Sequence, residues 1–134
     1  MDKNLKSNFF ISHWLPVILF CTFIFVQSHQ PTPKSMPSIP HIDKFIHFSV
    51  YGILGILFYR AFKSSGLKNK RKTIIALSII LTGLYGLSDE LHQYFLPYRD
   101  ADLFDAIADF CGGVFGVFLI SRYHAFFSLP RFAW

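Results

Sequence analysis

The chain has 134 residues, a formal net charge of +5 and a strongly apolar composition. Hydrophobic residues make up 52% and charged residues 16%, with a mean hydropathy of +0.39, whereas soluble domains carry about 25% charged residues. The length allows a single domain, residues 1–134. Because the basic residues flank apolar stretches and do not cover a polar surface, the composition favours a membrane protein and argues against nucleic-acid binding.

Four apolar stretches predict an all-α membrane protein with four transmembrane helices. A span needs about 20 residues, which places the helices at about residues 9–28, 43–63, 73–95 and 102–123. Residues 1–28 also have features of a cleaved secretory signal, but such signals have apolar runs of only about 7 to 15 residues, so we expect an uncleaved anchor. A soluble four-helix bundle is the alternative, but the polar segments are too short to cover its surface.

The basic residues predict the orientation of these helices in the membrane. Ten of the thirteen Lys and Arg residues lie near the two termini or in the connection after the second apolar stretch. Cytoplasmic loops carry an excess of Lys and Arg. We therefore expect both termini in the cytoplasm, and the loops at residues 29–42 and 96–101 on the outer side.

Acidic residues gather at the other ends of the same helices. Seven of the eight lie there: Asp43, Asp89, Glu90, Asp100, Asp102, Asp105 and Asp109. Only Lys34, Lys44 and Arg99 accompany them, so seven negative and three positive charges leave an excess of four. A carboxylate at such a depth must take up a proton, bind a cation or open to water.

Helical periodicity places these polar residues on one side of each of three helices. The three sets are Asp43, Lys44, His47 and Tyr51; Glu90 and Gln93; and Asp102, Asp105, Asp109, Gly112 and Gly116. Gly112 and Gly116 form a GxxxG pair that lets another helix approach closely. We therefore expect the three polar sides to face one interior crevice on the outer side of the membrane.

Two segments resemble the motifs of VanZ-like membrane proteins. The run from Glu90 to Gly116 reads ExxQxFxPxRxxDxxDxxxDxxGxxxG, and the run from Asp43 to Tyr51 reads DKFIHFSVY. One departure is Asp109, where the family more often has asparagine, and it adds an acid to the crevice. The resemblance implies a multi-pass protein of the bacterial cytoplasmic (inner) membrane, in a family named for a member that lowers susceptibility to the glycopeptide antibiotic teicoplanin.

Binding of a lipid-linked cell-wall precursor or another envelope lipid is the first functional hypothesis. Arg99 and Lys44 would contact phosphate, and the acids would contact polar or cationic groups. The candidate ligand-binding residues are Lys44, His47, Tyr51, Glu90, Gln93, Arg99, Asp102, Asp105 and Asp109. Membrane lipids, and a second copy of the chain in a homo-oligomer, are the expected partners.

A membrane-embedded enzyme is the second hypothesis. Glu90, Asp105, Asp109 and His47 are its catalytic candidates, and together with His92 they have the oxygen and nitrogen atoms that a divalent metal needs. No HExxH, CxxC or nucleophile-elbow motif supports this hypothesis, so the cofactor is unknown and a divalent metal is not indicated by a motif. Proton or ion movement is a third hypothesis, disfavoured because the inner halves of the helices carry almost no ionisable residue.

Each charged residue also has a purely structural interpretation. Asp43 and Asp102 stand where the second and fourth helices begin, and an aspartate at that position commonly caps a helix. Arg99 and Lys44 could serve only to neutralise nearby carboxylates, as buried charges usually require. The excess of acids over bases is what favours a ligand over pairing alone.

Overall fold

The computed structural model describes residues 3–31, 39–67 and 70–127. It contains the helices α1 (Lys3–His29), α2 (Ile42–Ser64), α3 (Arg71–Tyr94) and α4 (Leu103–Phe127). All four contain a segment long and apolar enough to cross a membrane, and the described ranges contain no strand. The predicted all-α fold with four transmembrane helices is confirmed. Part of the 29–42 loop, and Lys34, Lys68 and Arg131, which entered the charge argument, lie outside the described residues.

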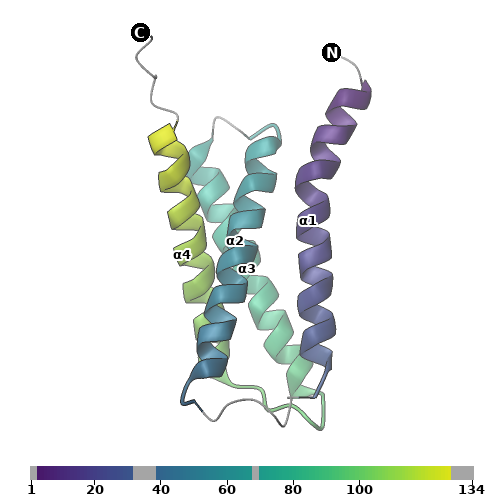
Figure 1. The fold of residues 1–134 in the computed structure, drawn as a ribbon, viewed down its shortest axis with the longest axis vertical. Coiled ribbons are helices and arrows are strands. Elements are labelled where there is room, and N and C mark those ends of the chain that lie inside the picture. Colours follow the sequence, from purple (N-terminus) through teal and green to yellow (C-terminus); the bar gives the residue numbers. More distant parts are fainter. Residues whose placement is uncertain (1–2, 32–38, 68–69, 128–134) are drawn as a thin grey trace.

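Successive helices run in opposite directions through the bundle (Figure 1). The start of α1, the end of α4 and the turn between α2 and α3 lie at one end, and the loop between α3 and α4 lies at the other. The start of α1 and the end of α4 therefore lie on the same side of the membrane. Assignment of that side to the cytoplasm stays a prediction from the basic residues.

The helix bounds differ by a few residues from the predicted ones. The first begins at Lys3, several residues before the expected start, because backbone hydrogen bonding continues past the end of an apolar run. The prediction that Asp43 caps α2 is wrong. His41 holds the cap position with a left-handed backbone (φ 63°), and Asp43 lies in the first turn, where its charge complements the helix dipole.

Glycines set the contact between α2 and α4, the most extensive helix pair in the described structure. A Cβ atom added to Gly112 would lie 2.1 Å from the carbonyl oxygen of Phe48. One added to Gly116 would lie 2.1 Å from the carbonyl oxygen of Gly52. Because both obstacles are backbone atoms, the two helices would have to separate to accept any side chain here.

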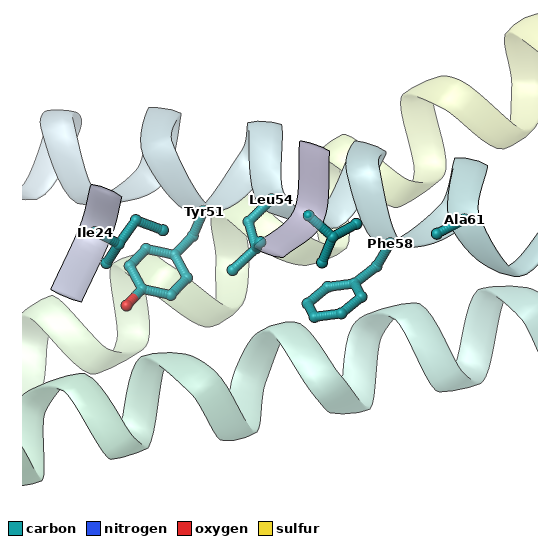
Figure 2. Close-up of a cluster of buried hydrophobic side chains, with 6 residues drawn as sticks. Ile24, Tyr51, Leu54, Phe58 and Ala61 are labelled. Carbon is teal, nitrogen blue, oxygen red and sulfur yellow. The ribbon is translucent and has the colours of Figure 1, made fainter. Parts of the chain in front are cut away.

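The first helix packs against α2 and touches α3, but makes no comparable contact with α4 in the described residues. A line of buried side chains along α2 faces it: Tyr51, Leu54, Phe58 and Ala61, with Ile24 of α1 beside them (Figure 2). The outward faces are apolar, and Leu19 and Phe118, for example, are 60% and 57% exposed. Such faces suit contact with acyl chains.

Candidate functional site

Lys44 joins the start of α2 to the start of α4. Its Nζ donates hydrogen bonds to Asp43 Oδ2 at 2.8 Å, Asp102 Oδ2 at 2.8 Å and Asp105 Oδ1 at 2.9 Å. An ammonium group has three N–H donors, and all three are used here. Lys44 therefore has no donor left for a phosphate, and its geometry fits the structural interpretation better than the expected ligand contact.

Asp102 connects three helices at the beginning of α4. Its Oδ1 accepts a hydrogen bond from the backbone N–H of Phe104 at 2.9 Å, so its predicted role as a helix cap is confirmed. Its own backbone N–H donates to Glu90 Oε2 at 3.1 Å. The hydrogen bond from Lys44, followed by that of the cap, lowers the pKa of the Asp102 carboxyl below its ordinary value.

A second cluster lies deeper, between α2, α3 and α4. His47 Nδ1 is 2.9 Å from Asp109 Oδ1, and one potential ligand atom from each of His47, Glu90 and Asp109 lies within 4.8 Å of the others. Asp109 is fully buried and Glu90 is 8% exposed. In the described part of the chain, Glu90 Oε1 and Asp109 Oδ2 are buried without a hydrogen-bond partner.

A cavity of about 510 Å³ opens beside these clusters, between α1, α2, the end of α3 and the following loop. One part of its wall is apolar and consists of Phe23, Ile24, Ile46 and Val50. The other part is polar and includes His47, Asp89, Gln93, Tyr98, Arg99, Asp100 and Asp105. The cavity is therefore amphipathic, with its charged groups at the end of the bundle where the acidic residues gather.

Only some of the residues that were predicted to form one crevice line the cavity. His47, Tyr51, Gln93, Arg99 and Asp105 line the cavity, whereas Lys44, Glu90, Asp102 and Asp109 do not. Two residues connect the cavity to residues outside its wall. His47 both lines the cavity and contacts Asp109, and Asp105 both lines it and accepts from Lys44.

Sequence reasoning missed the contribution of α1 to the cavity. Gln27 and Ser28 line it, and they were detectable as polar residues at the end of an otherwise apolar helix. Asp89 is absent from the polar side predicted for its helix, but it lines the cavity, is 7% exposed and accepts a hydrogen bond from Gln93 Nε2 at 3.4 Å. Tyr98, whose hydroxyl donates to the His29 carbonyl at 3.0 Å, carried no sequence signal.

The VanZ/LLP1 family model matches residues 6–127. The chain belongs to the VanZ/LLP1 family. A curated relative, an uncharacterized protein of the fission yeast Schizosaccharomyces pombe, is 32% identical over 107 residues, which cover 79% of this chain and 62% of the relative. This VanZ/LLP1 chain thus spans less than two thirds of that relative's length, and no solved structure matches it. The resemblance found in the motifs is confirmed.

In this VanZ/LLP1 protein His92 lies apart from the buried cluster. Its Nε2 is 3.3 Å from His29 Nδ1, and its ring lies 4.8 Å from that of Phe25, between centroids. These contacts join the end of α3 to the end of α1. Of the five potential metal ligands that the sequence offered, His92 is therefore used elsewhere, and Asp105 is held by Lys44.

Proposed function

We propose that this VanZ/LLP1 protein binds a lipid that has a phosphate and a further polar group in its head. The observation that supports this most directly is the cavity, which joins an apolar wall to a polar end containing Arg99. A membrane-embedded cavity with both kinds of wall matches a molecule with both kinds of part.

The apolar wall supports entry of the ligand from the membrane. Phe23 of α1 and Ile46 of α2 line the cavity, and their side chains are 52% and 39% exposed. In the proposed binding mode the ligand would reach this apolar wall from between α1 and α2. A lipid chain could stay in contact with apolar atoms while its head enters the polar end.

The polar end indicates what the head must contain. The planar guanidinium of Arg99 suits a phosphate, which it can bind with two parallel hydrogen bonds. Asp89, Asp100 and Asp105 line the same space, however, and they would repel a bare phosphate. A head that adds hydroxyl or amino groups to its phosphate, as a lipid-linked sugar or wall precursor does, fits both sets of residues.

The proposal also includes a location. Because the basic residues predict that the α2–α3 turn is cytoplasmic, the cavity would open on the outer side of the bacterial cytoplasmic membrane. An envelope lipid is the class of ligand available there. An effect on susceptibility to teicoplanin would follow only for a lipid that is itself a cell-wall precursor.

A membrane-embedded enzyme that acts on the same lipid phosphate or glycan is the second candidate. It is favoured by one observation, that His47 belongs both to the cavity wall and to the cluster with Glu90 and Asp109. If the Glu90→Gln variant converted such a lipid at the same rate as the unmodified chain, this candidate would be eliminated. Proton or ion movement has less support, because α3 carries no acidic or basic side chain from Thr73 to Ser88.

Substitution of Arg99 tests lipid binding. In nanodiscs, Arg99→Ala should bind a polyisoprenyl phosphate sugar about tenfold more weakly, because a charge-assisted hydrogen bond is lost. Native mass spectrometry measures the bound fraction, and phosphatidylcholine serves as the comparison lipid. The matched control is Arg122→Ala at the other end of α4, where Arg122 lies 5.1 Å from the centre of the Phe118 ring. Equal binding by the two variants would refute the proposal.

A further inference from the structure

We propose that His47, Glu90 and Asp109 form a site for one divalent transition-metal ion, of the class that includes Zn²⁺ and Mn²⁺. The three side chains come from α2, α3 and α4, so the ion would join three helices near the acidic end of the bundle. This inference does not depend on whether a lipid enters the cavity.

The donor set suits such an ion. One imidazole nitrogen and two carboxylate oxygens are ligands that Zn²⁺ and Mn²⁺ accept, and three protein ligands leave further coordination positions for water or substrate. One ligand atom from each side chain lies within 4.8 Å of the others. An ion with bonds of about 2.1 Å holds its ligands about 3.4 Å apart, so small side-chain rotations would close the site.

Two oxygens of the cluster lack a hydrogen bond in the described part of the chain. They are Glu90 Oε1 and Asp109 Oδ2, and both residues are more than nine-tenths buried. A buried acceptor without a partner is costly, and this cluster contains two of them. One shared proton would satisfy only part of this need, whereas a divalent ion would satisfy both carboxylates.

The surrounding charges favour a cation. Electrostatic interactions connect His47 to Asp109, Asp105 and Glu90, all of which are acids. Lys44 donates to three other carboxylates and makes no hydrogen bond with Glu90 or Asp109 among the described residues. The negative charge of Glu90 and Asp109 is therefore not neutralised by this lysine.

Neighbouring groups hold the two acids in place. Glu90 Oε2 accepts from the backbone N–H of Asp102, which leaves Oε1 for another partner. A Cβ atom on Gly86 would lie 2.8 Å from Asp109 Cβ and 3.1 Å from Asp109 Oδ2, so this glycine provides the space for the side chain. Supporting contacts of this kind orient the ligands of metal sites.

Metal binding can be measured without any lipid ligand. The full chain in phosphatidylcholine nanodiscs, stripped with a chelator, is titrated with Zn²⁺ or Mn²⁺ by calorimetry, and retained metal is counted by mass spectrometry. One ion per chain is expected. Glu90→Gln and Asp109→Asn each replace a charged ligand by a neutral amide and should weaken binding by at least about 100-fold. His92→Gln, which changes a histidine at the same end of the bundle but outside the cluster, should bind like the unmodified chain.

A spectroscopic measurement on the unmodified chain covers the case in which a variant fails to fold. Cu²⁺ bound at the site should show coupling to nitrogen of one histidine in electron paramagnetic resonance, and Zn²⁺ should displace it. Absence of a retained ion, or equal retention by the chain and its Asp109→Asn variant, overturns the proposal. Loss of lipid binding in Arg99→Ala with unchanged metal binding would separate the two proposals.

Discussion

The bundle of α2, α3 and α4 has two halves, and their buried polar atoms are satisfied to different extents. In the half around Gly52 and Gly116, the buried hydroxyls of Ser78 and Thr82 donate to carbonyls of their own helix at 2.7 Å, and backbones pack directly together. In the half around Lys44, four carboxylates are buried, and two oxygens lack a partner in the described chain. The glycine half allows close packing of the helices. The acidic half retains buried acceptors without a hydrogen-bond partner, which is typical of functional sites.

The strongest test of this difference is a side chain added in the glycine half. Gly116→Ala places a Cβ 2.1 Å from the Gly52 carbonyl oxygen, so α2 and α4 must move apart. We expect a loss of about 3 kcal/mol in stability, at the upper end for overpacked cores. Thermal unfolding in detergent measures it. Gly66→Ala, where nothing lies within 4 Å, is the control and should change little; comparable losses in the two variants would contradict the packing argument.

Removal of Lys44 tests whether the acidic half depends on this one cation. Lys44→Met leaves Asp43, Asp102 and Asp105 without their shared donor, and Asp105 has a side chain only 10% exposed. We expect a loss of about 2 kcal/mol, less than for a fully buried pair because the Lys44 side chain is 25% exposed. In the same thermal assay, Lys44→Met combined with Asp105→Asn should lose less than the sum of the single variants. Strict additivity would show that the pair is not coupled.

The smallest expected effect is a pH dependence that only the acidic half should show. The pKa of Asp102 is lowered from an ordinary value of 3.8, mainly by the hydrogen bond from Lys44. Its stabilising contribution is therefore present above about pH 4 and is lost as pH falls through the lower folded-state value. Thermal unfolding between about pH 5 and pH 3 should show a shallower decline in Asp102→Asn, which keeps a cap, than in the unmodified chain. Identical slopes would contradict this assignment.

The sequence predicted the coarse fold well because its signals are local. Helix number follows from hydropathy, and the gathering of acids at one end follows from the direction of each helix. The separation of Lys44 from the His47 cluster could not be predicted, because periodicity gives the angle of a side chain around its own helix but not the distance to another helix. The contribution of α1 to the cavity could not be predicted either, because Phe23 and Ile24 are ordinary residues of an apolar span.

The hydrogen bonds of Lys44 also bear on the order in which the protein is made. Lys44 leaves the ribosome well before Asp102 and Asp105, which are 58 and 61 residues further along the chain. Until then Lys44 can pair with Asp43 but not with its two acceptors at the start of α4, so the acidic half stays open until α4 arrives. Insertion of α4 thus completes the acidic half, and a chain truncated before Asp102 would leave Lys44 without two of its three acceptors.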